Sequence, residues 1–218
     1  MSASLPTLAV IGGTGPLGSG LAGRLARAGY PVVIGSRAPD RAQATAASLG
    51  ALPASPARGE GNAAAAMAGD IVILTVPWSS HPAIIAELAP HVAGKIVIDT
   101  TVPLAPQHPA RVALPAEGSA AQSAQRRLQT ARVVAAFHHV AAHKLHKNDP
   151  IDCDVLVFGD ARADRDTVIA LVAAIGLRGV HAGPLANAAA GEALTSVLIG
   201  INRTYKADGA GIRITGIA

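Results

Sequence analysis

Cysteine and aromatic residues are scarce in this 218-residue chain. It contains one cysteine, Cys153, and only two Phe, two Tyr and one Trp. A single cysteine excludes an intramolecular disulfide framework and a thiolate zinc site, and favours a reducing, cytoplasmic location. The lack of stacking side chains argues against RNA or single-stranded DNA as a partner. The core must therefore consist of Ala, Val, Ile and Leu, for which this length suffices without cross-links.

Long hydrophobic runs are also missing. No stretch reaches the roughly 18–20 apolar residues of a membrane-spanning helix. The uncharged segment 1–23 lacks the early basic residues of a signal peptide and is interrupted by glycines. We therefore expect a soluble, unexported protein with no membrane partner. The formal net charge of +4 permits an anionic ligand without requiring nucleic acid.

Short apolar runs alternate with alanine-rich amphipathic stretches, a pattern typical of a parallel α/β sheet. Strands are expected at residues 7–11, 31–36, 70–76, 95–99, 132–136, 154–159 and 178–182. Helices are expected at residues 16–28, 40–49, 62–68, 82–89, 119–130, 164–175 and 187–201, with loops at 50–61, 100–118 and 137–150. This order predicts a Rossmann-type doubly wound parallel sheet in residues 1–135 and a smaller C-terminal α/β lobe in residues 136–218.

A glycine motif follows the first expected strand. Gly13-Thr14-Gly15-Pro16-Leu17-Gly18 fits G-x-G-x-x-G between a strand and a helix. In such a motif the first glycine allows the tight turn, the second lets the backbone approach a pyrophosphate and the third lets helix and strand pack closely. The helix N-terminus adds free N–H groups for the phosphates. The alternative is a plain glycine-rich turn.

The end of the second expected strand indicates which dinucleotide binds. An NAD enzyme places Asp or Glu there for the ribose 2′-hydroxyl. This chain has Ser36 and Arg37 instead, with Arg41 one helical turn further on. A hydroxyl and two guanidinium groups suit a 2′-phosphate, which a carboxylate would repel. We therefore predict NADP(H), the alternative being solvated arginines at a helix start.

Two further strand ends face the same crevice. Val76-Pro77-Trp78 follows one buried strand, and Asp99-Thr100-Thr101-Val102-Pro103 ends the next. Open α/β sheets bind ligands at this edge, where the Pro–Trp pair could line a nicotinamide site or Trp78 could simply cover the core. The chain has no Tyr-x-x-x-Lys acid/base pair. A reductase without an evident proton donor fits direct hydride transfer between two cofactors.

These residues together resemble the F420-dependent NADP oxidoreductase family (8-hydroxy-5-deazaflavin:NADPH oxidoreductases) over nearly the whole chain. The resemblance rests on the segments Val10–Gly15 with Leu17-Gly18, Gly35–Arg37, Thr75–Trp78, Val102-Pro103, His138, Ala182–Leu185, Glu192–Thr195 and Gly209–Ile212. The chain departs from the family pattern at Pro16, at Asp99-Thr100-Thr101 and at His139.

The resemblance implies site residues, partners and an activity. Hydride would pass between NADPH and the deazaflavin coenzyme F420, and the chain would form a homodimer through its C-terminal lobe. Thr14, Gly15, Pro16 and Leu17 would contact the pyrophosphate; Ser36, Arg37 and Arg41 the 2′-phosphate; Val76 and Pro77 the nicotinamide end; and Val140, Ala142 and Thr195 the deazaflavin. His138 would be the catalytic residue, polarising the deazaflavin ring.

The histidine-rich segment 138–147 leaves three interpretations open. It could bind a metal with Asp152, Cys153 and Asp154, but the adjacent Lys144 and Lys147 would repel a dication, so no metal site is predicted. It could bind the anionic second cofactor, or it could be a solvated basic loop.

Two other functions stay open from the sequence. One is an NADPH-dependent reductase of a flavin, a ferric chelate or a small imine or ketone. The other is a non-catalytic NADP-sensing protein. The sequence decides neither the physiological direction nor the pathway.

Overall fold

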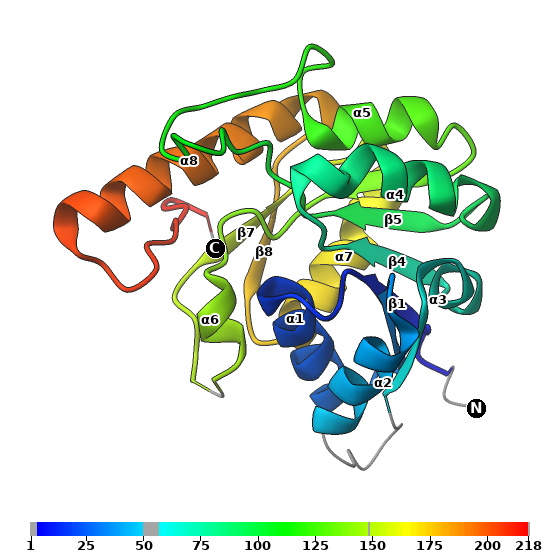
Figure 1. Ribbon diagram of the computed structural model, residues 1–218. Helices are drawn as coiled ribbons and strands as arrows, with labels where there is room; N and C mark the ends of the chain where they lie inside the picture. Colours follow the sequence, from blue (N-terminus) through cyan, green and yellow to red (C-terminus); the bar gives the residue numbers. More distant parts are fainter. Residues whose placement is uncertain (1–3, 50–56, 148, 218) are drawn as a thin grey trace.

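The computed structural model describes residues 4–49, 57–147 and 149–217 (Figure 1). Its larger sheet has the strand order β3-β2-β1-β4-β5-β6, and all neighbours run parallel. The strands are β1 (Leu8–Ile11), β2 (Val32–Ser36), β3 (Arg58–Gly61), β4 (Ile71–Leu74), β5 (Ile96–Asp99) and β6 (Arg132–Ala135). The order reverses between β1 and β4, which is where doubly wound sheets bind ligands.

Helices cover both faces of this sheet. Along each strand alternate residues face opposite sides, so Leu8 and Val10 join one apolar cluster and Ala9 and Ile11 the other. One face carries α1 (Pro16–Arg27), α2 (Pro39–Ser48) and α7 (Arg162–Ala174). The other carries α3 (Asn62–Ala68), α4 (His81–Leu88) and α5 (Ala120–Arg127), the 3₁₀ turns η1 (Trp78–Ser80) and η2 (Ala89–His91) flanking α4. Both clusters consist mainly of aliphatic residues, as the composition requires.

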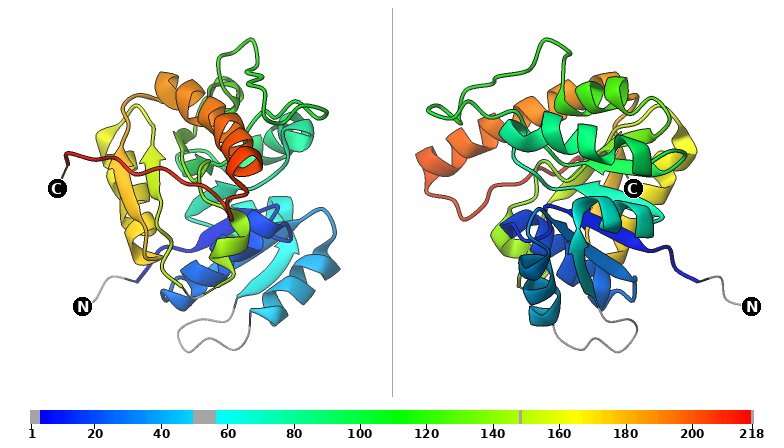
Figure 2. Two further views of the ribbon diagram at one scale, coloured as in Figure 1. Left: turned by 90° about the vertical axis from the view of Figure 1, so that its left-hand side faces the viewer. Right: turned by 45° about the vertical axis from the view of Figure 1, so that its right-hand side comes forward.

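A small second sheet follows the large one. It pairs β7 (Asp154–Val157) in parallel with β8 (Arg178–His181), and an antiparallel bridge between Ala135 and Phe158 joins it to the end of β6. After η3 (Leu185–Asn187), helix α8 (Ala188–Tyr205) projects from the body, and the C-terminal tail returns along β7 (Figures 1 and 2). The Asp154 backbone N–H donates to the Ile212 carbonyl at 2.7 Å. Among the described residues, no helix has the length and apolar character needed to cross a membrane.

The predicted fold class is confirmed, with two local errors. Residues 58–61, predicted as loop, form β3; residues 50–56 lie outside the described chain. The sequence RGEG has no apolar alternation, but a Cβ on Gly59 would overlap the backbone of Ala42 and Gln43, so glycine lets α2 pack directly on this edge strand. The predicted loop 137–150 also contains a short helix, α6 (Ala142–Leu145). The other elements match the expected ranges with shifts at their ends.

Arg24 connects α1 to the segment that contains α6. Its guanidinium donates to five backbone carbonyls, at 2.7–3.2 Å, those of Lys144, Leu145, Lys147, Asp149 and Ile175. Helices α1 and α6 pack closely here, because a Cβ on Gly20 would lie 2.7 Å from the Leu145 Cβ. Arg24 therefore holds α6 at the rim of the sheet.

Arg24→Met should lower the free energy of unfolding by about 2–4 kcal/mol, because bonds from a charged donor contribute more than neutral ones and the freed carbonyls lose their partner. Urea denaturation measures this loss. Arg27→Met, on an exposed position of the same helix, is the matched control. Equal midpoints for the two variants would contradict a clamping role for Arg24.

Candidate active site

The glycine loop begins the site at the end of β1. Gly12 has a φ of +77°, which L-residues adopt at a cost, and a Cβ there would lie 2.8 Å from the Thr75 carbonyl oxygen. A Cβ on Gly18 would lie 2.7 Å from the Gly12 oxygen, so the third motif glycine does allow close packing. The first motif glycine, Gly13, does not supply the left-handed turn: its φ is ordinary, and the preceding Gly12 makes that turn.

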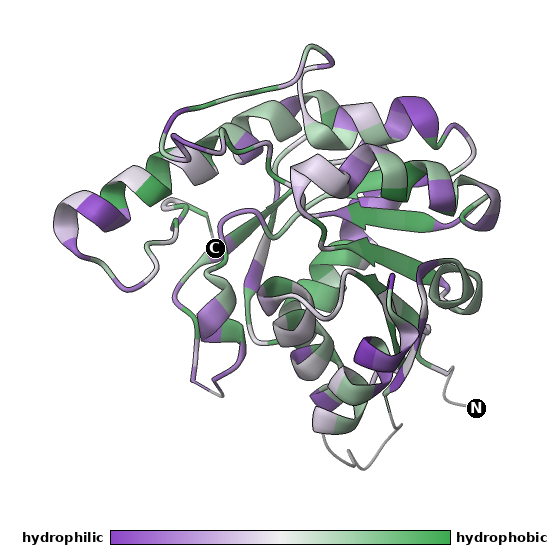
Figure 3. Ribbon diagram, viewed as in Figure 1, coloured by the Kyte–Doolittle hydropathy of each residue, from purple (hydrophilic) through white to green (hydrophobic). Residues whose placement is uncertain are grey.

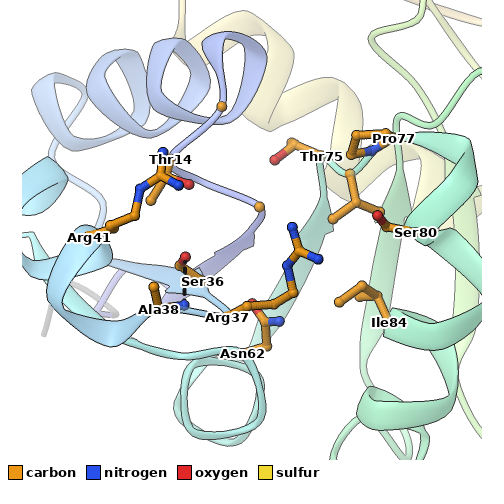
Figure 4. A pocket seen from close by; sticks show the side chains of 13 residues that line it. Thr14, Ser36, Arg37, Ala38, Arg41, Asn62, Thr75, Pro77, Ser80 and Ile84 are labelled. Atoms are coloured by element: carbon orange, nitrogen blue, oxygen red, sulfur yellow. Dashed lines mark hydrogen bonds between the residues drawn. The ribbon is translucent and has the colours of Figure 1, made fainter.

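A pocket of about 470 Å³ opens in front of this loop (Figure 4). Its walls come from the β1–α1 turn, the end of β2, the start of α3, the end of β4, and the region from η1 to α4. The lining residues are Gly12, Thr14, Gly15, Ser36, Arg37, Ala38, Arg41, Asn62, Thr75, Val76, Pro77, Ser80 and Ile84. We call it the first pocket.

The first pocket is built for an anion. Arg37, from the end of β2, and Arg41, from α2, both point into it, and no acidic residue lines it (Figure 4). The Ser36 hydroxyl accepts a hydrogen bond from the Ala38 N–H at 3.2 Å, which fixes the turn between strand and helix. Helix α1 begins at Pro16, which has no N–H, so the first N–H groups of the helix without intrahelical partners are those of Leu17 and Gly18. Positive charge and free donors thus surround the end of the sheet where the strand order reverses.

A second pocket of about 320 Å³ adjoins the first. Its residues are Gly15, Pro16, Leu17, Thr75, Val76, Pro77, Thr100, Thr101, Val102, Leu104, Phe137, His138, Val140, Ala142 and Thr195. Gly15, Thr75, Val76 and Pro77 line both pockets. Two ligands, one in each, would therefore meet along this wall. Apart from His138 and four threonines, the second pocket presents apolar side chains and glycine, which suits a flat ring system.

His138 is buried beside the second pocket and packs on Phe158, with a ring-centroid distance of 6.4 Å. Neither ring nitrogen has a hydrogen-bond partner among the described residues. Burial, with a smaller effect of His139, lowers the pKa of His138 to about 3, although the Asp99 charge opposes this. Its backbone carbonyl accepts from the Thr195 hydroxyl at 3.1 Å. The imidazole is therefore neutral, and its two buried ring nitrogens have no partner among the described residues.

The low pKa of His138 predicts acid sensitivity. Its folded-state value near 3 lies below the ordinary 6.5, so the stability it contributes is present above pH 6.5 and is lost as the pH falls toward 3. Between pH 7.5 and pH 5 the unfolding free energy of the wild type should fall relative to that of His138→Leu by about 2 kcal/mol. Chemical denaturation of both proteins at the two pH values measures it; parallel pH dependences would contradict it.

Four side chains of the histidine-rich segment, those of three histidines and one lysine, contact other parts of the chain. The His143 Nε2 lies 2.8 Å from an Asp208 carboxylate oxygen, and the Lys144 ammonium donates to the Gly209 carbonyl at 2.9 Å. His146 lies 2.8 Å from the Pro16 carbonyl oxygen, and His139 lies 2.8 Å from that of Gly191. In the described parts of the chain, no three His, Cys, Asp or Glu side chains come together as a metal site. These contacts join the segment to α1, α8 and the C-terminal tail.

The structure brings together all but one of the predicted site residues. Thr14, Gly15, Ser36, Arg37, Arg41, Val76 and Pro77 line the first pocket; Gly15, Pro16, Leu17, Val76, Pro77, His138, Val140, Ala142 and Thr195 line the second. Gly13 lines neither, because it packs beneath the turn against Val10 and Ile34.

Several lining residues were not among those predicted. Thr100, Thr101 and Val102 stand at a strand end that the sequence does place at the crevice. Asn62, Ser80 and Ile84 carry no such signal, because they begin or lie within helices that only the fold brings to the pocket. Phe137 has a φ of +68°, a strained conformation for a bulky residue that no sequence pattern indicates.

Known proteins resemble this chain along almost its full length. Residues 7–103 match the family model described as NADP oxidoreductase, coenzyme F420-dependent. The chain is 38% identical to the F420-dependent NADP reductase of Methanocaldococcus jannaschii, over 96% of this chain and 98% of that protein. It is also 38% identical to the protein of the same name from Methanothermobacter thermautotrophicus, over 96% of this chain and 95% of that one.

The fold has a matching solved structure. A crystal structure from Arthrobacter sp. FB24, of a candidate F420-dependent NADP-reductase, superposes with a TM-score of 0.81 and 24% identity, covering 97% of this chain and 99% of that one. By its sequence similarity to these relatives over almost the full length, this chain belongs to the F420-dependent NADP reductase family.

Proposed function

We propose that this chain transfers a hydride between NADPH and the deazaflavin coenzyme F420. The observation that supports this most strongly is the wall shared by the two pockets, since Gly15, Thr75, Val76 and Pro77 would contact ligands on both sides. Sequence relatives named F420-dependent NADP reductase supply the identity of the two ligands.

The first pocket is proposed to hold NADP(H). Thr14 and Gly15, with the free N–H groups of α1, would bind the pyrophosphate, and Ser36, Arg37 and Arg41 the 2′-phosphate. Val76 and Pro77, which belong to the shared wall, would contact the nicotinamide. The lining of the first pocket fits NADP(H), because basic side chains stand at the end of β2, where the 2′-phosphate would lie, and Val76 and Pro77 give the nicotinamide ring an apolar surface.

The second pocket is proposed to hold the deazaflavin ring. Pro16 and Leu17, which the resemblance places at the pyrophosphate, line the second pocket and not the first, so we propose that they offer apolar contacts to the deazaflavin together with Val140 and Ala142. Thr195 fixes the His138 backbone by the hydroxyl bond described above. His138, whose two buried ring nitrogens have no hydrogen-bond partner in the described part of the chain, would bond to a polar atom of the deazaflavin and polarise it. Because its pKa is about 3, it would act as a neutral hydrogen-bonding group and not as an imidazolium acid.

Catalysis then depends mainly on positioning. When bound, the two cofactors supply the redox chemistry, a hydride passing between nicotinamide C4 and deazaflavin C5. The chain's residues hold the two rings face to face and exclude water from the space between them. No acid or base of the protein has to act on the transferred hydride, which agrees with the absence of a charged side chain from the shared wall.

A spectrophotometric assay tests the proposed function. NADPH mixed with oxidised F420 and a catalytic amount of protein should lose the deazaflavin absorbance, at a rate proportional to protein. Free FMN, ferric citrate and a cyclic imine serve as comparison acceptors. Turnover of one of these without turnover of F420 would contradict the proposal, as would tight NADPH binding with no oxidation by any acceptor.

The assembly, location and domain roles are parts of the same proposal. Val197, Ile201 and Tyr205 on the projecting half of α8 are at least 37% exposed, and apolar stretches recur along this helix (Figure 3). A homodimer would cover them, and sedimentation would show its mass. We also propose that residues 1–135 bind NADP, that residues 136–218 contact the deazaflavin and the partner subunit, and that the protein is cytoplasmic.

A further inference from the structure

A buried histidine–aspartate pair stands behind the wall that the two pockets share. The His81 Nε2 lies 2.7 Å from an Asp99 carboxylate oxygen, and both side chains are about 1% exposed. The carboxylate can only accept, so the His81 Nε2 carries the hydrogen. His81 is the first residue of α4, and Asp99 is the last residue of β5.

Asp99 continues the connection into the second pocket. Its other carboxylate oxygen accepts from the Thr101 backbone N–H at 2.9 Å. The Thr101 hydroxyl donates in turn to the Val76 carbonyl at 3.4 Å, and the neighbouring Thr100 hydroxyl donates to the Leu74 carbonyl at 2.7 Å. Both threonines line the second pocket.

The other end of the connection lies at the first pocket. Ser80, directly before His81, and Ile84, one turn further along α4, line that pocket. A chain of hydrogen bonds thus runs from α4, through His81, Asp99 and Thr101, to Val76, which lines both pockets.

Stability alone does not account for such a pair. Removing a carboxylate from water costs about as much as its hydrogen bonds in the interior return, so a buried pair of this kind stabilises a fold little compared with apolar residues. Burial raises the pKa of Asp99, but the hydrogen bonds and charge of His81 and the Thr101 N–H lower it further, so the carboxylate stays ionised. The Asp99 charge acts on two buried titratable groups: it opposes the lowering of the His138 pKa, and it adds to the rise in the pKa of Glu192 on α8.

We propose that His81 and Asp99 are positioning residues for hydride transfer, holding the β4 and β5 strand ends so that the ligands of the two pockets meet at reactive distance. The inference rests on the proposed function. Neither side chain lines a pocket, so both act through Thr101, Val76 and the start of α4.

Single-turnover kinetics of Asp99→Asn test this role. The variant keeps the shape of the side chain and weakens its bond to His81. With NADPH and F420 both saturating, the hydride-transfer rate should fall about 10–100-fold, the loss expected when reacting groups are displaced by a fraction of an ångström. NADPH affinity, followed by the emission of Trp78, the one tryptophan of the sequence, should change less than twofold. Asp70→Asn, which weakens a surface bond from the Thr7 N–H in the same way, is the matched control.

Two further variants complete the design. The double variant His81→Ala/Asp99→Ser should lose no more rate than Asp99→Asn, because the pair acts as one unit. Thr101→Val removes only the final bond to Val76, and should slow transfer severalfold even where Asp99→Asn does not fold. Rates equal to wild type in the variants that fold, or rate losses that only follow losses of NADPH affinity, overturn the positioning role. A wild-type chain inert toward F420 overturns the proposed function as well.

Discussion

Arg37→Asp should weaken NADPH binding by about 10²–10³-fold and leave NADH binding within about threefold of wild type. The wild-type guanidinium enters the first pocket from the end of β2, where the 2′-phosphate is proposed to bind. A charge-assisted hydrogen bond contributes about 1.5–3 kcal/mol, which corresponds to about 10–150-fold in affinity. The new carboxylate adds repulsion of the phosphate to that loss, whereas NADH has no phosphate to repel.

Titration of Trp78 emission with each dinucleotide measures this selectivity. Arg162→Asp makes the same charge change at an exposed position of α7, away from both pockets, and should leave both affinities unchanged. Arg41→Asp should show a smaller loss of the same kind, because Arg41 stands one helical turn beyond Arg37, on the first turn of α2, and not at the end of β2 itself. Equal losses for NADPH and NADH in Arg37→Asp would mean that the pocket does not distinguish the 2′-phosphate.

Ala142→Phe should reduce F420 turnover at least about 100-fold while NADPH affinity stays within about twofold. Ala142 begins α6 and lines the second pocket but not the first. It is half-buried, so a larger side chain can enter the pocket without disrupting the core. A phenyl ring there would occupy the space proposed for the deazaflavin and prevent face-to-face stacking, on which the rate depends.

The matched control for this variant is Ala86→Phe, which adds the same ring at an exposed position of α4. It should turn over F420 at the wild-type rate. Activity of Ala142→Phe close to wild type would show that the second pocket does not hold the acceptor. Loss of NADPH binding together with turnover would show instead that the two pockets are not separate sites.

The sequence predicts the first pocket better than the second. Its main parts are local: a glycine turn, a strand end with Ser36 and Arg37, and a strand end with Val76 and Pro77. Each pattern depends on neighbours in the chain, so the fold class and the phosphate-binding side follow from the sequence. Even there the turn depends on Gly12, one residue before the motif, because the left-handed conformation falls where the backbone leaves β1.

The second pocket depends on contacts between distant segments. Thr101, Phe137 and Thr195 come from three regions that only the order of strands and the packing of α8 bring together. Glu192 shows the same limit: its carboxylate accepts from the Ala120 and Ala121 N–H groups at the start of α5, 72 and 71 residues away. Such pairings carry no local pattern. The basic segment 138–147 also shows this, since its side chains reach α8, the tail and α1.

Deuterium transfer tests the central claim most directly. NADPH carrying deuterium at the transferable C4 position is mixed with oxidised F420 and the protein in ordinary water, and the reduced deazaflavin is analysed by mass spectrometry. The two rings are proposed to meet face to face beside the wall formed by Gly15, Thr75, Val76 and Pro77. The deuterium should therefore appear at deazaflavin C5 without exchange with solvent. Reduced F420 that contains only solvent hydrogen, or no reduced F420 at all, would contradict direct transfer between the two pockets.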